Sequence, residues 1–139
     1  MKLAKITKLT LTVLLSGALL APVQADDTPL AEQMDEISSS LKGLRRAETW
    51  ADKVALAQAA QAACLKSLEH LPATFEKITD EKEKAKATAD YKRLMGKSFA
   101  ALCALESAFL EEDEDAVDAA MDAIKALKKE GHEKYEDDE

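Results

Sequence analysis

The fold is set by a pattern that is clearest in residues 28–44, TPLAEQMDEISSSLKGL. The apolar residues there are separated by four, three, four and three positions; they are Leu30, Met34, Ile37, Leu41 and Leu44. Because an α-helix completes a turn in about 3.6 residues, this spacing places all five side chains on one face. Thr28 can cap the helix and Pro29 suits its first position, so we expect a helix that reaches about Ala47.

Three further segments repeat this spacing. We expect a second helix over residues 48–70, a third over residues 88–111 and a fourth that runs from the acidic turn 111–115 to His132 and Tyr135. The inward residues predicted for the second helix are Val54, Ala57, Cys64, Leu65 and Leu68. A charged connection covers residues 72–87, although Asp80 to Lys84 can add a helical turn.

The composition agrees with a helical protein. The chain is rich in Ala, Leu, Glu, Lys and Asp, holds 4 Gly and 3 Pro, and shows no strand pattern. Four amphipathic helices joined by mostly short connections predict an all-α fold, an antiparallel up-down-up-down four-helix bundle.

The N-terminal segment has the layout of a secretory signal peptide. Lysines at positions 2, 5 and 8 precede an apolar run over residues 9–21, and Ala25 ends a small-residue cleavage site. The run is shorter than the roughly 20 residues that span a bilayer, although an N-terminal membrane anchor is the alternative interpretation. We expect residues 1–25 to be removed and residues 26–139 to form one exported domain in the periplasm, with no membrane insertion after cleavage.

Charge narrows the set of partners. Loss of three lysines with the signal peptide changes the formal net charge from −8 to −11. A domain with this negative charge is not expected to bind nucleic acid or anionic lipid, whereas it can bind a basic partner protein. Nothing in the sequence requires more than a monomer.

Two residues with donor atoms lie near opposite ends of the domain. In an up-down-up-down bundle, the start of the first helix and the end of the fourth share one end of the bundle. At 1.5 Å per residue, Met34 lies about 9 Å from that end and His132 about 7 Å. His132 also falls within about 20° of Met121 around the helix, which places it on the apolar face.

The same residues carry a resemblance to a known family. Met34-Asp35-Glu36-Ile37 continues through Leu41-Lys42 near one end, and His132-Glu133-Lys134-Tyr135 lies near the other. With Phe99 in the third helix, these pieces resemble the soluble periplasmic cytochrome b562 family, over nearly all of residues 26–136. The resemblance implies a four-helix bundle, an architecture that is already well described for this cytochrome. It also implies one non-covalent haem b (iron protoporphyrin IX) per chain.

The resemblance assigns roles to particular residues. It implies that Met34 and His132 are the axial iron ligands and that Ile37, Leu41, Met95 and Phe99 line the macrocycle. Lys128 stands where the family's cytochrome has an arginine near the haem edge. The implied function is a periplasmic b-type cytochrome that carries single electrons to unidentified redox partner proteins. We do not expect an enzyme, because two axial ligands leave no open iron position and no hydrolase or transferase motif is present.

Alternatives remain open at the site. Gly131 follows a lysine-rich stretch, a helix-stop signal that would leave His132 outside the fourth helix. His70, at the end of the second helix, is a rival ligand that would pair with His132. The runner-up function is a haem-free exported helical bundle acting as a binding or chaperone-like protein.

The two cysteines form no recognised motif. There is no Cys-x-x-Cys-His, which excludes c-type haem attachment through that sequence. An exported compartment permits a disulfide, but Cys64 and Cys103 differ in level by about 10 Å, whereas a bridge tolerates Cα separations of about 7 Å. We therefore expect both to be small buried residues without a bond between them.

Overall fold

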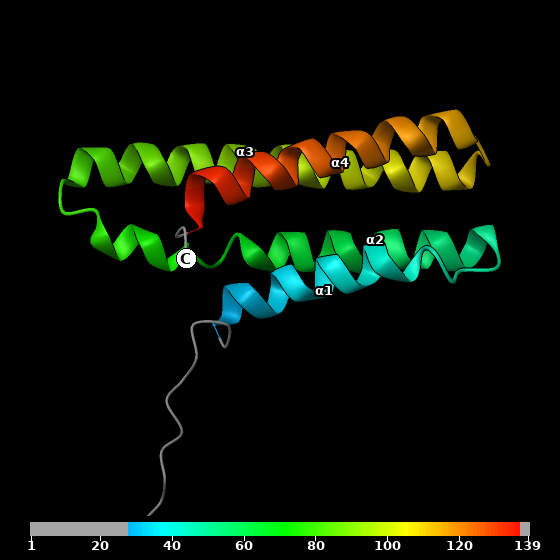
Figure 1. Cartoon of the computed structure of the whole chain (residues 1–139), viewed down its shortest axis with the longest axis horizontal. Coiled ribbons are helices and arrows are strands. Elements are labelled where there is room, and N and C mark those ends of the chain that lie inside the picture. The colour runs from blue at the N-terminus through cyan, green and yellow to red at the C-terminus, as the bar shows by residue number, and fades with distance from the viewer. Residues whose placement is uncertain (1–27, 137–139) are drawn as a thin grey trace, which may run out of the picture.

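The computed structural model describes residues 28–136, and these residues form helices without a strand (Figure 1). The four long helices are α1 (Pro29–Gly43), α2 (Trp50–Ser67), α3 (Glu81–Leu110) and α4 (Glu114–Tyr135), with a short 3-10 helix, η2 (Ala73–Lys77), between α2 and α3. The all-α prediction is confirmed. The predicted signal peptide, residues 1–25, lies outside the described residues. No helix within residues 28–136 has both the length and the apolar character needed to cross a membrane.

Side-chain caps explain where the helices begin. Before each long helix, an oxygen of the capping side chain accepts a hydrogen bond from a backbone amide three residues further on; the capping residues are Thr28, Thr49, Asp80 and Asp113. The cap predicted at Thr28 is therefore confirmed. The predicted start of the third helix at Thr88 is wrong, because Asp80 caps the chain and the charged residues after it continue as helix.

The first two helices end earlier than predicted. After α1 and α2 the backbone tightens into bonds that span three residues, such as Arg46 N–H to Gly43 O at 2.9 Å and His70 N–H to Ser67 O at 3.2 Å. Such bonds satisfy the last carbonyl groups of a helix but do not extend it. Pro72, which has no N–H, then prevents α2 from resuming.

The helices form two layers in an antiparallel up-down-up-down bundle, as predicted. In Figure 1, α3 and α4 make the upper layer and α1 and α2 the lower one, with α1 and α4 both on the viewer's side. Three pairs pack closely along their lengths: α1 with α2, α2 with α3, and α3 with α4. The pair α1 and α4 is not among them, so the fourth seam of the bundle is not closed by close helix packing.

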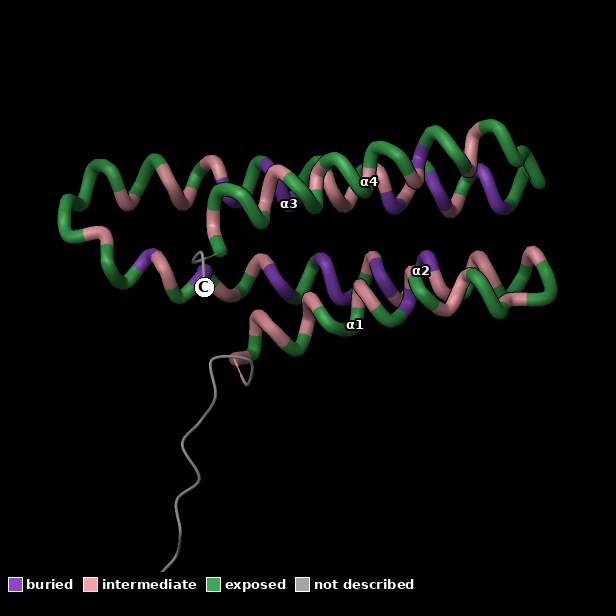
Figure 2. Tube along the Cα trace, viewed as in Figure 1, coloured by how far each residue is buried: buried purple, intermediate pink, exposed green. Residues whose placement is uncertain are grey.

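The core belongs mainly to α2 and α3. Figure 2 shows that buried positions are concentrated on these two helices, whereas α1 and α4 are largely half-buried or exposed. Small residues dominate the buried face of α2, which consists of Ala57, Ala60, Ala63, Cys64 and Ser67. Leu65, which the sequence places inward, is 49% exposed, so that prediction is wrong.

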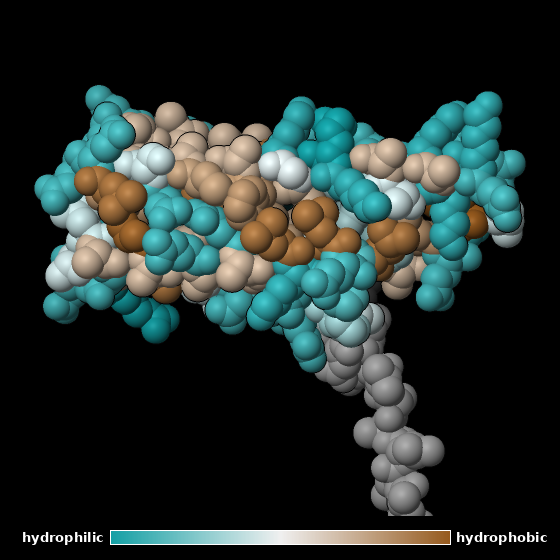
Figure 3. Space-filling model, turned by 180° about the vertical axis from the view of Figure 1, so that it is seen from behind, coloured by the Kyte–Doolittle hydropathy of each residue, from teal (hydrophilic) through white to brown (hydrophobic). Residues whose placement is uncertain are grey.

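Some apolar surface remains on the α2–α3 side. Figure 3, viewed from behind, shows apolar side chains gathered in a band between the two layers. The large hydrophobic residues that the structure exposes are Leu65, Leu71 and Leu110.

Candidate functional site

The first group of predicted site residues lies on the inner face of α1. Met34, Ile37 and Leu41 are half-buried and pack against a core cluster that includes Tyr91 and Met95. Their spacing of three and four residues, combined with the Thr28 cap, sets this face toward the core. The thioether of Met34 therefore lies at an apolar face near the start of α1.

The second group lies on α3, across the bundle from α1. Met95 is 6% exposed and belongs to the core cluster, and half-buried Phe99 packs against it. The structure thus brings five of the seven predicted site residues to one apolar cluster. Their contact with a cofactor stays a prediction.

The remaining two predicted residues lie on α4. Contrary to the stop signal, α4 continues through Gly131 to Tyr135, so His132 lies within the helix. The His132 side chain is half exposed, and its Nδ1 lies 3.1 Å from Glu136 Oε2. Lys128, one turn earlier, is exposed. The structure places His132 in helical geometry but records no contact between it and Met34.

Aromatic packing holds the last turn of α4 against the rest of the bundle. The Tyr135 ring meets Phe75 and Tyr91 edge to face, with centroids 5.4 and 5.6 Å apart. The Tyr135 carbonyl also accepts a hydrogen bond from Thr74 Oγ1 at 3.1 Å. Because Phe75 and Thr74 belong to η2, this short helix anchors the end of α4.

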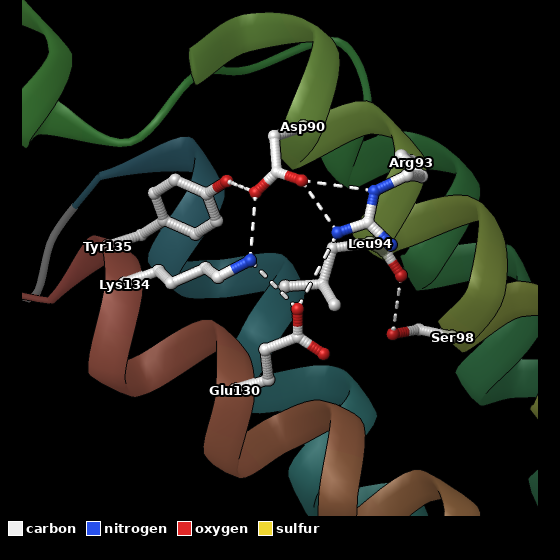
Figure 4. A network of polar contacts seen from close by, with 7 residues as sticks. All are labelled: Asp90, Arg93, Leu94, Ser98, Glu130, Lys134 and Tyr135. Atoms are coloured by element: carbon white, nitrogen blue, oxygen red, sulfur yellow. Dashed lines mark hydrogen bonds and ion pairs between the residues drawn. The ribbon is translucent and has the colours of Figure 1, made fainter. Parts of the chain in front are cut away.

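A polar network ties the same turn to α3 (Figure 4). The Asp90 carboxylate accepts hydrogen bonds from Tyr135 Oη at 2.5 Å, Arg93 Nη2 at 2.6 Å and Lys134 Nζ at 3.1 Å. Lys134 also pairs with Glu130 at 2.8 Å. The network therefore spans the α4 segment that contains His132.

These contacts shift the ionisation of both ends of the network. The hydrogen bond from Tyr135, then those from Arg93 and Lys134, hold the pKa of Asp90 well below its usual range. Burial, followed by the hydrogen bond to Asp90, raises the pKa of Tyr135 well above its usual value. The carboxylate and the neutral phenol thus stabilise one another throughout the neutral pH range.

Sequence reasoning did not identify this network. Asp90 and Arg93 form a local pair three residues apart, which a helical pattern can suggest. The bond between Asp90 and Tyr135 joins α3 to α4, and no local spacing signals it. The available signal was indirect, since Tyr91 and Tyr135 both carry large apolar rings that pack in the core cluster.

The other residues with possible donor atoms are His70 and the two cysteines. His70 lies half-buried in the turn after α2, at the bundle end where α4 finishes, so it remains an alternative donor. Cys64 and Cys103 are free thiols. Burial, and then the neighbouring Cys103, raise the pKa of the Cys64 thiol to about 11, which keeps it protonated and unreactive at neutral pH.

The donor chemistry is suited to an iron porphyrin. Within residues 28–136, no three His, Cys, Asp or Glu side chains gather as a metal site. A porphyrin brings four nitrogens and needs only axial donors from the chain. The contact of His132 Nδ1 with Glu136 leaves Nε2 available to a metal, and Met34 offers a soft sulfur from an apolar face.

Comparison with known proteins gives one match. The family model described as cytochrome b562 matches residues 29–136, a segment that contains all four helices and every predicted site residue. The comparisons with curated proteins and with solved structures gave no match.

Proposed function

The chain belongs to the cytochrome b562 family, a family of haem-binding four-helix bundles, and we propose that it is a periplasmic electron carrier. In this proposal it binds one non-covalent haem b, with Met34 and His132 as the axial ligands. Ile37, Leu41, Met95 and Phe99 border the macrocycle, and Lys128 offers a cation near its edge.

The observation that carries the proposal is the unequal closure of the bundle. Three seams are closed by helix packing, whereas α1 and α4 turn half-buried apolar residues toward the core without packing closely on each other. The two candidate donors lie on these two helices, in the turns nearest one end of the bundle. A flat apolar group with two axial positions suits such a seam.

The ligand types define the expected chemistry. Bound haem would supply a one-electron couple. Imidazole binds both iron states, whereas the thioether of Met34 favours ferrous iron and raises the reduction potential. With both axial positions taken by side chains, the chain directs the group to electron transfer. The apolar side chains Ile37, Leu41 and Phe99 would exclude water from it, which also raises the potential.

Location and partners form part of the same proposal. Residues 1–25 would direct export and be removed, leaving an acidic domain in the periplasm. Its charge favours redox partner proteins with a basic surface, and we expect it to act as a monomer without binding nucleic acid or inserting into the membrane.

A visible spectrum tests the function directly. Protein purified from the exported fraction and mixed with haemin should show a Soret band and, on reduction, sharp visible bands of a six-coordinate iron. No Soret band after haemin addition would contradict the proposal and favour the haem-free binding bundle.

Variants identify the ligands. Met34→Ala should lower the midpoint potential, and His132→Ala should weaken haem binding at least about tenfold, a loss of roughly 1.4 kcal/mol or more. His70→Ala is the matched control, since it removes the other histidine at the same end. A potential that changes with His70→Ala and not with Met34→Ala would show the ligand assignment to be wrong.

A further inference from the structure

The network around Asp90 contains none of the residues proposed to contact the cofactor, yet it flanks a proposed ligand. Asp90 lies on α3, and its carboxylate accepts hydrogen bonds from the Tyr135 phenol, the Lys134 ammonium and the Arg93 guanidinium. The Arg93 guanidinium also lies 3.5 Å from Glu130. In the sequence of α4, His132 follows Glu130 and precedes Lys134 and Tyr135, and these three neighbours are each bound to α3 (Figure 4).

We propose that Asp90 is a positioning residue for His132, which fixes the last turn of α4 on α3 and so sets the imidazole at its level before a cofactor arrives. The proposal rests on the proposed function, because positioning matters only if His132 binds iron.

The need for such a device follows from the local sequence. Gly131 lies directly before His132 and favours the unfolded chain by about 1 kcal/mol relative to alanine. The last turn of a helix also frays, because its final carbonyl groups have no helical partners. A ligand in that turn would sample many positions unless contacts from outside α4 held it.

Asp90 is suited to that task by its geometry. From α3, its side chain binds two residues in the last turn of α4, Lys134 and Tyr135. The bond from Tyr135 Oη is short, at 2.5 Å. The Tyr135 ring is meanwhile packed against Phe75 and Tyr91, so its hydroxyl is presented from a fixed position. A short bond from a fixed phenol to a carboxylate is a charge-assisted hydrogen bond, the stronger class.

The test compares variants that weaken the network to different extents. Asp90→Ala removes the bonds from Arg93, Lys134 and Tyr135 to this carboxylate, Asp90→Asn removes the charge, and Tyr135→Phe keeps the ring but removes the hydroxyl. Glu83→Gln is the matched control, because it also removes one negative charge from an exposed ion pair on α3 but lies away from α4. All variants are made in the full chain and studied both without haem and with added haemin.

Hydrogen exchange of the haem-free protein gives the first measurement. In Asp90→Ala, the backbone amides of residues 132–136 should exchange at least about fivefold faster than in the wild type, while those of α2 keep their protection. Tyr135→Phe should speed exchange of the same amides by a smaller factor, and Glu83→Gln should leave their exchange rates unchanged. Unchanged exchange in the last turn of Asp90→Ala would overturn the proposal.

Haem binding gives the second measurement. Asp90→Ala should bind haemin about tenfold more weakly and show a shifted midpoint potential, whereas Glu83→Gln should match the wild type in affinity. Faster exchange with unchanged affinity and potential would overturn the positioning role alone. A wild-type protein that binds no haem would contradict the proposed function, and the positioning role with it, so the two failures are distinguishable.

Discussion

Two seams of this bundle, α2–α3 and α1–α4, are closed to very different degrees. Between α2 and α3, both Gln58 and Gln61 donate hydrogen bonds to Glu106, and Tyr91 Oη donates to Ser67 O. Buried residues are numerous on α2 and α3, whereas Ser40 is the buried residue of α1 and Ala120 that of α4. The comparison shows that α2 and α3 are joined by close packing and hydrogen bonds, whereas α1 and α4 leave apolar side chains half-buried.

Residue size accounts for the difference. The α2 face consists largely of alanines, which allow neighbouring backbones to approach closely. The inner faces of α1 and α4 carry larger side chains that are only half covered, among them Met34, Ile37 and Ile124. Large apolar side chains left half exposed gain free energy when another apolar group covers them.

The largest contrast should come from truncating one side chain in each seam. Leu102 on α3 is 2% exposed, so Leu102→Ala should lower the free energy of unfolding by about 2–5 kcal/mol. Ile37→Ala in the haem-free protein should cost less than about 2 kcal/mol, because Ile37 is half-buried. Urea unfolding measures both, and equal costs would contradict the view that the α1–α4 side is less complete.

Haemin should reduce this asymmetry. At a free concentration 100 times its dissociation constant, a ligand that binds only the folded state adds about 2.7 kcal/mol to the free energy of unfolding. If the group enters the α1–α4 seam, amide protection should rise mainly in α1 and α4. A rise confined to α2 and α3 would place the group elsewhere, and the Met34→Ala variant serves as the control.

Alkaline pH should weaken the closed seam. Burial raises the pKa of Tyr91 to about 12, while the unfolded phenol ionises near 10, so this group stabilises the fold fully below about pH 10 and less as pH rises toward 12. The loss should be roughly 1–2 kcal/mol. Tyr91→Phe should make the decline in unfolding free energy between pH 10 and 12 shallower, although the raised pKa values of Cys64 and Tyr135 leave part of it. An identical decline in both proteins would exclude this role for Tyr91.

The smallest effect concerns the helix end that carries His132. A Cβ at Gly131 would meet Leu94 Cδ2 at 3.4 Å, an ordinary contact, so Gly131→Ala should stabilise the protein by about 0.5–1 kcal/mol. Gly96→Ala in α3 is the matched control, because nothing lies within 4 Å of its added Cβ. The midpoint temperature of thermal unfolding, measured for both variants and the wild type, tests this prediction. Stabilisation by Gly96→Ala alone would indicate that the last turn of α4 is not firmly helical.

Much of the fold can be predicted from the sequence, because it depends on the local spacing of apolar residues and on helix caps. The stripe that begins at Leu30 and the Thr28 cap correctly predict the start and the inner face of α1, although the helix ends at Gly43 and not near Ala47. The early start of α3 was missed because charged residues after Asp80 look like a loop, although charged residues with long side chains are good helix formers. Leu65 was misplaced because hydrophobicity alone favours leucine over the alanines that the tight α2–α3 seam requires.

The candidate site can be predicted from the sequence only in part. Met34, Ile37, Leu41, Met95 and Phe99 share one cluster because each lies on the apolar stripe of its own helix. The sequence pattern correctly predicts α4 as far as Tyr135 but leaves a stop at Gly131 open, because the contacts from η2 and Asp90 that hold the last turn are not contained in the local sequence. Tertiary contacts here overrule a local stop signal.

The start of α1 and the end of α4 lie at one end of the bundle, and this arrangement has a consequence for how the molecule matures. The two proposed donors lie in the first helix and in the last turn of the last helix, so nearly the whole domain separates them along the chain. Contacts between neighbouring helices can form early, whereas this pairing must close the longest loop and so forms late. A chain clipped at either end would keep its α2–α3 core yet lose a donor. Haem retention would therefore report on the integrity of the whole domain.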